Sequence, residues 1–263
     1  MGRISVAVVD TGIFPHMDIE NKIIGFKDMI HNRRVPYDDN GHGTHVSSII
    51  SKMAPGVYLT GIKVLDRNGK GKSEYAIDAM KWIIDNKEKY GIRIVNISIG
   101  TREEEESSDL VKAVESVWEA GIVVVCAAGN NGPDNNTITT PGVSRKIITV
   151  GSYDVLEYKD RAGNIRKFYS GRGPTSACVV KPDVVAKGNH VLGCNNSRKG
   201  YVYKSGTSMA APYISGAIAR LLIKKPDMSP KEVKLLLREK AVDMGKSRQE
   251  QGWGRIDADR LIE

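Results

Sequence analysis

Residues 4–12 read Ile4-Ser-Val-Ala-Val-Val-Asp10-Thr-Gly12, a valine-rich run that ends in a carboxylate and a glycine turn. An apolar run of this length is typical of a buried strand in a parallel sheet. Similar short runs, bounded by Gly, Asn or Pro, alternate with segments of helical period, which predicts a parallel sheet flanked by helices. We expect core strands at 4–10, 57–63, 94–98, 122–127 and 147–151. We expect helices at 44–52, 73–89, 108–120, 207–223 and 230–241, and short strands and turns at 163–203.

The whole chain has the size of one large domain. Its 263 residues, 40% hydrophobic and 27% charged, can bury a substantial core, and no stretch reads as a linker, so we expect a single domain over residues 1–263. No apolar run approaches the ~20 residues that span a bilayer, and a soluble protein without membrane contact is expected. The net charge of +8 comes from dispersed Lys and Arg, which favours a solubilising surface over nucleic-acid binding.

The amino terminus and the cysteines bear on the compartment. The chain enters an apolar strand at Ile4 without the long apolar segment and small-residue cleavage site of a secretory signal. Three cysteines, Cys126, Cys178 and Cys194, cannot all pair within one chain. Both features favour the cytoplasm, whereas a presequence removed by processing would imply a secreted protein.

Polar residues close several of the predicted strands. Ligands of open parallel sheets bind beyond the carboxyl ends of the strands, which points to Asp10, to 98–100 and to 129–130. A buried carboxylate at Asp10 needs a partner, and a histidine ring is the partner that would make it catalytic. Taken alone, this segment fits a turn or helix-capping aspartate better.

A second motif, Asn40-Gly-His42-Gly-Thr-His45, precedes a predicted helix. The glycines on both sides of His42 remove side-chain bulk, so the imidazole can meet both a substrate and a neighbouring strand. The same His-x-x-His pattern fits a pair of metal ligands on one helical turn equally well. For His45, a packed or capping role is at least as good an interpretation.

A third motif, Lys204-Ser-Gly206-Thr-Ser208-Met-Ala-Ala-Pro212, leads into a long apolar helix. Ser208 would lie in the first turn, where free N–H groups and the helix dipole favour a developing oxyanion. A serine before a helix is usually only an N-cap. The small residues around Ser208 favour more than a cap, because they leave room beside its hydroxyl.

In order and spacing, the three motifs resemble the active-site signatures of the subtilisin-like serine proteases, or subtilases. The resemblance runs from Val6 to Leu261. It implies a three-layer, doubly wound α/β fold with a central, mostly parallel sheet. It also implies a serine endopeptidase that forms an acyl-enzyme, with Ser208 as nucleophile, His42 as general base and Asp10 orienting the histidine. No metal or organic cofactor takes part in that chemistry.

The resemblance also assigns residues that contact the substrate. Asn130 corresponds to the oxyanion-hole asparagine of the family. Ser98, Ile99 and Gly100 correspond to the strand that pairs with an extended substrate, and Ala127, Ala128 and Gly129 to the opposite wall of the primary specificity pocket. Thr139 aligns with the floor of that pocket, which implies a medium-sized apolar or polar site without charge selection. The implied partners are protein or peptide substrates, with room for an inhibitor protein or a pro-segment outside this chain.

Two stretches depart from the usual family pattern. The stretch 47–55 lacks the loop that binds calcium after the histidine helix in many relatives, so we expect that site to be absent, although structural calcium elsewhere stays open. The acidic run 102–106 fits favourable charge at a helix N-terminus, or attraction of basic substrate residues.

Two other function classes remain. A catalytically silent relative used for binding or regulation is disfavoured by the intact Asp10, His42, Ser208 and Asn130. A metal hydrolase would use His42, His45 and Asp10 instead.

Overall fold

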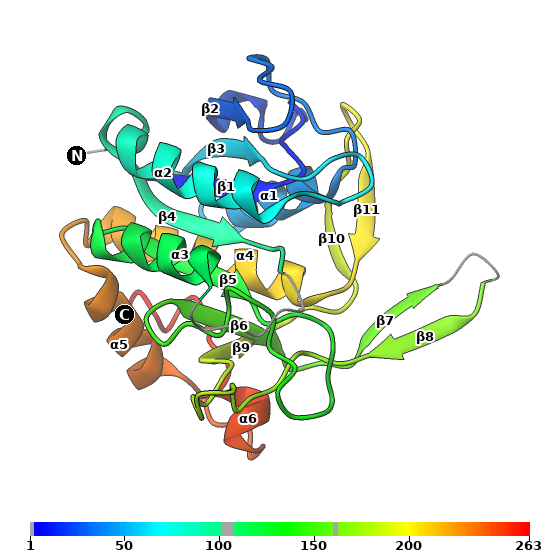
Figure 1. Ribbon diagram of the computed structural model, residues 1–263, viewed down its shortest axis with the longest axis vertical. Helices are drawn as coiled ribbons and strands as arrows, with labels where there is room; N and C mark the ends of the chain where they lie inside the picture. Colours follow the sequence, from blue (N-terminus) through cyan, green and yellow to red (C-terminus); the bar gives the residue numbers. More distant parts are fainter. Residues whose placement is uncertain (1–2, 101–107, 160–162) are drawn as a thin grey trace.

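A seven-stranded parallel sheet runs through the middle of the molecule, with helices on both of its faces (Figure 1). The computed structural model describes residues 3–100, 108–159 and 163–263, and the expectation for the acidic run 102–106 lies outside them. The strand order is β2-β3-β1-β4-β5-β6-β9, and every pairing in this sheet is parallel. The strands are β1 (Ser5–Asp10), β2 (Ile23–Asp28), β3 (Tyr58–Lys63), β4 (Ile92–Ile97), β5 (Val123–Ala127), β6 (Ile148–Ser152) and β9 (Val184–Ala186).

The helices divide between the two faces because alternate residues of each strand point to opposite sides. In β1, Val6 and Val8 enter one buried cluster, which includes residues of α1, α4 and α5, whereas Ala7 and Val9 enter the other, with α2 and α3. This explains why four successive apolar residues, Val6 to Val9, form the middle of the strand. The helices are α1 (His42–Met53), α2 (Ser73–Tyr90), α3 (Asp109–Glu119), α4 (Thr207–Lys224), α5 (Pro230–Lys240) and the short α6 (Arg248–Gln251). The expected three-layer α/β fold is confirmed.

Two antiparallel hairpins lie outside the main sheet. The first, β7 (Leu156–Lys159) with β8 (Ile165–Phe168), projects away from the body of the molecule (Figure 1). The second, β10 (Val191–Cys194) with β11 (Tyr201–Lys204), contacts α1. Within the described part of the chain, no helix has both the length and the apolar character needed to cross a bilayer.

Each predicted strand and helix has a counterpart, and the ends differ by a few residues. Strand β2 was missed, because only two of its six residues are fully buried and its sequence lacks a continuous apolar run. Strand β9 has three residues and lies within the stretch predicted as short strands and turns. Helix α1 connects to β3 through residues 54–57.

Candidate active site

Asp10 and His42 form a close pair at the carboxyl end of the sheet. Nδ1 of His42 lies 2.8 Å from Oδ1 and 2.9 Å from Oδ2 of Asp10. Because a carboxylate only accepts, Nδ1 carries the proton, which leaves Nε2 as the free base of the neutral ring. Asp10 is fully buried at the end of β1, whereas the His42 side chain keeps 24% of its surface exposed. The open side of the ring therefore faces the solvent and the cleft.

Helix α1 approaches β1 so closely that a glycine is needed at its second position. A Cβ atom on Gly43 would lie 2.1 Å from the carbonyl oxygen of Gly12 and 3.1 Å from Cβ of Asp10. The N–H of Gly43 instead donates to Oγ1 of Thr11 at 2.9 Å. The glycine after His42 thus allows the close approach of the two segments that carry Asp10 and His42.

Asp38 holds this junction together, and the sequence did not single it out. Its buried carboxylate accepts from the N–H groups of Gly41 and Thr44 at 2.8 and 2.9 Å. It also accepts from Oγ1 of Thr11 and Oγ1 of Thr44 at 2.9 and 2.6 Å. Burial opposes its charge, but these hydrogen bonds keep the pKa of Asp38 below its usual value. A charged Asp38 therefore caps α1 and links it to the residue after Asp10.

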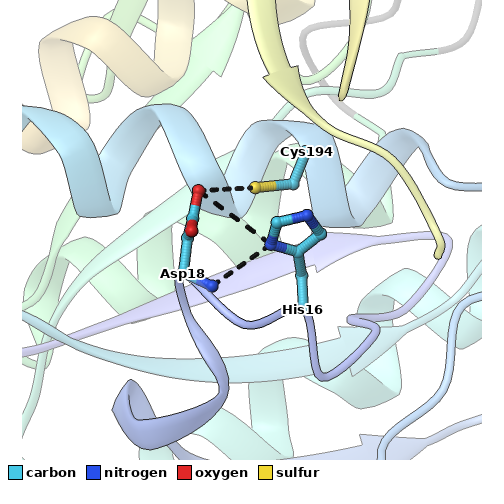
Figure 2. Close-up of side chains that lie close together, drawn as sticks. All are labelled: His16, Asp18 and Cys194. Atoms are coloured by element: carbon cyan, nitrogen blue, oxygen red, sulfur yellow. Dashed lines mark hydrogen bonds and ion pairs between the residues drawn. The ribbon is translucent and has the colours of Figure 1, made fainter. Parts of the chain in front are cut away.

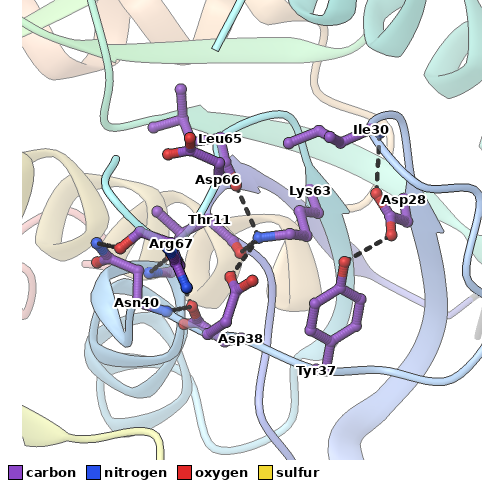
Figure 3. Close-up of polar contacts among 12 residues, drawn as sticks. Thr11, Asp28, Ile30, Tyr37, Asp38, Asn40, Lys63, Leu65, Asp66 and Arg67 are labelled. Atoms are coloured by element: carbon purple, nitrogen blue, oxygen red, sulfur yellow. Dashed lines mark hydrogen bonds and ion pairs between the residues drawn. The ribbon is translucent and has the colours of Figure 1, made fainter. Parts of the chain in front are cut away.

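A buried ammonium supports the same junction from the other side. Nζ of Lys63, at the end of β3, donates to the carbonyl oxygens of Thr11 and Leu65, each at 2.7 Å, and to Oδ1 of Asp39 at 2.6 Å. Figure 3 shows Lys63 directed toward Thr11 and Leu65. The three donors of the ammonium are thus all used, as a fully buried cation requires.

The pKa of His42 is raised above its ordinary value. Burial alone would lower it, but the charge of Asp10 and the hydrogen bond to it outweigh burial. The positive charge of Lys204 works in the opposite direction to Asp10. The environment thus stabilises the imidazolium that forms when His42 accepts a proton.

Ser208 is the second residue of α4, as the motif predicted. Its Oγ donates to the carbonyl oxygen of Ser98 at 2.8 Å, and among the described residues no hydrogen bond joins it to His42. Both side chains line the same hollow, of about 690 Å³. The Ser208 hydroxyl is therefore bonded to Ser98 and not to His42 in this arrangement.

A buried polar chain supports the start of α4. Pro212 lies inside the helix and has no N–H, so the carbonyl of Ser208 lacks its usual helical donor. Oγ of Ser98 donates to that carbonyl at 3.2 Å. Ser98 in turn accepts from Asn96 at 2.9 Å, and Asn96 accepts from Ser215 at 2.8 Å. This series of hydrogen bonds fastens α4 to β4 near Ser208, and nothing in the sequence motifs points to it.

Asn130 follows β5 and contacts the start of α4. Its Oδ1 accepts from the N–H of Thr207 at 2.9 Å and from Oγ1 of Thr207 at 3.2 Å. Since a backbone N–H can only donate, the side-chain oxygen of Asn130 faces Thr207, and its NH₂ group points away from Thr207. Asn130 and Ser208 line the same hollows, so this NH₂ group and the first-turn N–H of Ser208 are available donors next to the hydroxyl.

A pocket of about 220 Å³ opens beside Ser208. Six of the seven predicted substrate-binding residues line it: Ser98, Ile99, Gly100, Ala127, Gly129 and Thr139. Thr139 packs closely against both walls. A Cβ atom added to Gly100 would lie 2.4 Å from Oγ1 of Thr139, and one added to Gly129 would lie 2.6 Å from Cγ2 of Thr139. Ala128 does not line the pocket. Its side chain is fully buried in a small apolar cluster with Val111, Ile138 and Val143.

The pocket adjoins two larger hollows. One, of about 620 Å³, shares Ser98, Ile99 and Gly100 with it and also includes His42. The other is the 690 Å³ hollow, which shares Ser208 and Asn130 with the pocket. The three hollows thus adjoin one another, and His42 lines both of the larger ones; together they are called the cleft.

His45 faces away from the cleft. Its Nε2 lies 3.1 Å from the carbonyl oxygens of Val191 and Val202 and therefore carries the proton. Its Nδ1 is buried without a partner, and burial lowers the pKa of His45 to about 4. Among the described residues, the ligand atoms of His42, His45 and Asp10 do not form a cluster of metal-binding size. The packed interpretation of His45 fits this arrangement, and the metal-hydrolase interpretation does not.

Sequence and structure comparisons agree on one family. The model of the subtilase family matches residues 2–254. Serine protease AprX of Bacillus subtilis (strain 168) is 41% identical over 267 residues, covering 89% of this chain and 60% of AprX. Subtilisin DY of Bacillus licheniformis is 33% identical over 257 residues, covering 93% of this chain and 86% of the relative.

The solved structures give the same answer. The structure titled Sphericase superposes with a TM-score of 0.81 at 30% identity, covering 97% of this chain and 92% of that one. A cold-adapted subtilisin-like serine proteinase superposes with a TM-score of 0.79 at 27% identity, covering 95% of this chain and 86% of the other. Subtilases need no cofactor for their chemistry. The chain belongs to the subtilase family.

Proposed function

We propose that this chain is a serine endopeptidase in which Ser208, His42 and Asp10 carry the chemistry. The observation that supports the proposal most directly is the Asp10–His42 pair at 2.8 Å, lying on the same cleft as Ser208. The cleft continues on both sides of Ser208, which suits an internal bond of an extended polypeptide. A substrate chain would then occupy the 620 Å³ hollow on one side and the 690 Å³ hollow on the other.

The proton moves between two residues during the reaction. Oγ of Ser208 attacks the carbonyl carbon while Nε2 of His42 takes its proton, and the peptide C–N bond breaks when His42 returns that proton to the leaving amine. Water then repeats the cycle on the acyl-enzyme and frees Ser208. Asp10 holds the ring through Nδ1 and stabilises the imidazolium, in keeping with the raised pKa of His42.

Two donors are proposed for the negative charge that develops on the carbonyl oxygen. We assign them to the NH₂ group of Asn130 and the N–H of Ser208, because the oxygen of Asn130 is already used by Thr207. The positive end of the α4 dipole acts in the same direction. Such donors stabilise the oxyanion without reorganisation during the reaction.

The 220 Å³ pocket would take the side chain on the amino side of the cleaved bond. Its described lining residues are uncharged, and Thr139 offers a methyl group and a hydroxyl. We therefore propose a medium-sized apolar or polar side chain at this position. We also propose one peptidase domain over residues 1–263, with protein or peptide substrates, and an inhibitor protein or a pro-segment outside this chain as a further partner.

We propose a reducing compartment, the cytoplasm, on the basis of the cysteines. Cys126, Cys178 and Cys194 are all unpaired in the structure. Fractionation of the native host cells, followed by immunodetection, would test a cytoplasmic location. Recovery from the culture medium would contradict it.

Labelling with a fluorophosphonate probe tests the proposed activity. The wild-type chain should react once per molecule and hydrolyse a denatured protein at internal bonds, and Ser208→Ala should do neither. Ser205→Ala is the matched control, because Ser205 lines the same hollow. The Ser205→Ala chain should label and hydrolyse as the wild type does. A silent relative would not label at all, and a metal hydrolase would lose activity to a chelator without labelling.

A further inference from the structure

Three side chains with metal-binding atoms converge away from the catalytic cleft: His16, Asp18 and Cys194 (Figure 2). Their ligand atoms all lie within 4.8 Å of one another, and they form the one such group of three among the described residues. His16 and Asp18 lie in the segment between β1 and β2, whereas Cys194 is the last residue of β10. The cluster thus joins parts of the chain that are 176 residues apart.

His16 is held in the orientation and tautomer of a metal ligand. Its ring is fully buried and packs edge-on against Tyr201, with centroids 5.1 Å apart. Nε2 lies 3.1 Å from the carbonyl oxygen of Gly200 and must carry the proton, because a carbonyl only accepts. Nδ1 lies at the cluster and accepts from the N–H of Asp18 at 3.2 Å, so a bound ion would take this lone pair in place of the N–H. Metal-bound histidines almost always donate the other ring N–H in this manner.

The distances from Asp18 to the other two ligand atoms are close to those of a tetrahedral site. Sγ of Cys194 is 3.7 Å from Oδ2 of Asp18, and Nδ1 of His16 is 4.0 Å from the same oxygen. With zinc–ligand bonds of about 2.0–2.3 Å, tetrahedral ligand atoms lie roughly 3.3–3.6 Å apart. Both distances exceed that spacing, so Asp18, whose Oδ2 also accepts from the hydroxyl of Tyr201 at 2.8 Å, would move inward to bind an ion. Its half-exposed side chain allows that movement.

We propose that His16, Asp18 and Cys194 bind one Zn²⁺ ion. Imidazole and thiolate ligands suit zinc, whereas calcium and magnesium prefer sites made of oxygen. The thiol proton of Cys194 leaves to solvent when the Zn–S bond forms, and thiolate plus carboxylate then balance the charge of the ion. Exposed Asp18 gives the ion access from solvent, and water takes the fourth position. The proposal does not depend on the proposed peptidase activity.

The site would stabilise the surroundings of α1. The segment that carries His16 contacts α1 through the N–H of Phe14, which donates to Oγ1 of Thr44 at 2.9 Å. The hairpin that carries Cys194 contacts α1 through His45 and through Ser48, whose Oγ accepts from the N–H of Cys194 at 2.9 Å. A bound ion would fasten these two supports of α1 to each other, so its effect should appear in thermal stability.

Zinc binding to the intact chain tests this proposal. After treatment with a chelator and its removal by dialysis, titration calorimetry with Zn²⁺ should show one site per chain and a raised Tm. Cobalt in place of zinc should give the absorption band of a thiolate-bound ion. Asp18→Asn and Cys194→Ser should weaken zinc binding by more than the roughly 10–100-fold typical of losing an outer partner.

Cys178→Ser is the matched control, because Cys178 is an exposed free cysteine outside the cluster. It should bind zinc as the wild type does. Asp18→Asn keeps the test valid if Cys194→Ser fails to fold, since Asp18 is exposed. Failure of the wild type to bind zinc, or equal affinity in Asp18→Asn, would overturn the site. A wild-type chain that binds zinc but does not react with the fluorophosphonate would contradict only the peptidase assignment.

Discussion

Ser98 and Ser208 exchange two hydrogen bonds. Oγ of Ser208 donates to the carbonyl of Ser98 at 2.8 Å, and Oγ of Ser98 donates to the carbonyl of Ser208 at 3.2 Å. The first bond holds the proposed nucleophile on the strand that a substrate would contact. The second occupies a carbonyl that Pro212 leaves without a helical donor. The proposed nucleophile is therefore held by the residue that follows β4 as well as by its own helix.

Ser98→Ala should lower the free energy of unfolding. The change leaves the carbonyl of Ser208 and the amide of Asn96 without their buried partner, at a cost of about 1–3 kcal/mol. Urea denaturation in a Ser208→Ala chain, which prevents self-digestion and keeps that carbonyl, measures the difference. Ser116→Ala on the exposed face of α3 should change stability by less than about 0.5 kcal/mol. Equal costs for the two variants would show that the Ser98 bond contributes nothing.

Two substitutions of Asn130 separate its two proposed tasks. Asn130→Asp keeps an oxygen for the N–H of Thr207 but removes the NH₂ donor, so kcat should fall roughly 10²–10³-fold, a magnitude established on subtilisin. Asn130→Ala should lose the same factor and also destabilise the start of α4. Steady-state kinetics and thermal unfolding give both readouts. Asn131→Ala, in the same pocket, is the control, and a comparable fall in its kcat would argue against the assignment to Asn130.

The acid limb of kcat/KM should report His42. Neutral His42 is the proposed base, and its pKa is raised, so activity should fall as the pH drops through a value above 6.5. Asp10→Asn removes the raising interactions, so the limb should move to lower pH while kcat falls roughly 10⁴-fold. Lys204→Met removes a lowering interaction and should move the limb upward. Lys199→Met at an exposed site is the control and should leave the acid limb where it is. If Asp10→Asn and Lys204→Met also leave the limb unmoved, the limb reports a group other than His42.

His45 should make the folded state sensitive to acid. Its pKa is lowered by burial to about 4, so the unfolded chain binds a proton below pH 6.5 while the folded chain does not. The stability contributed by neutral His45 is present above pH 6.5 and is lost progressively down to pH 4, by at most about 3 kcal/mol. Urea denaturation measures the free energy of unfolding of a Ser208→Ala chain with and without His45→Gln. Between pH 6.5 and pH 4, the chain with His45→Gln should lose less of it, by up to this amount. Parallel curves for the two chains would contradict the neutral, buried state.

The sequence by itself determined the sheet and the candidate catalytic residues. Strand β1 has four successive apolar residues, Val6 to Val9, because both faces of the sheet are covered, and that pattern is visible in the sequence. Asp10, His42 and Ser208 lie in short motifs whose glycines and small residues mark them locally. The edge strand β2 was missed because a half-exposed strand has no such pattern.

Only the tertiary structure decided how those residues are held. Asp38, Lys63 and Asn96 are ordinary polar residues in the sequence, and their roles come from buried contacts with distant segments. The Asp18–Cys194 contact is of the same kind, since it joins the loop after β1 to the end of β10. Local patterns predict which segments become strands and helices. Buried polar partners are fixed by packing between those elements, and a single sequence carries no local signal for them.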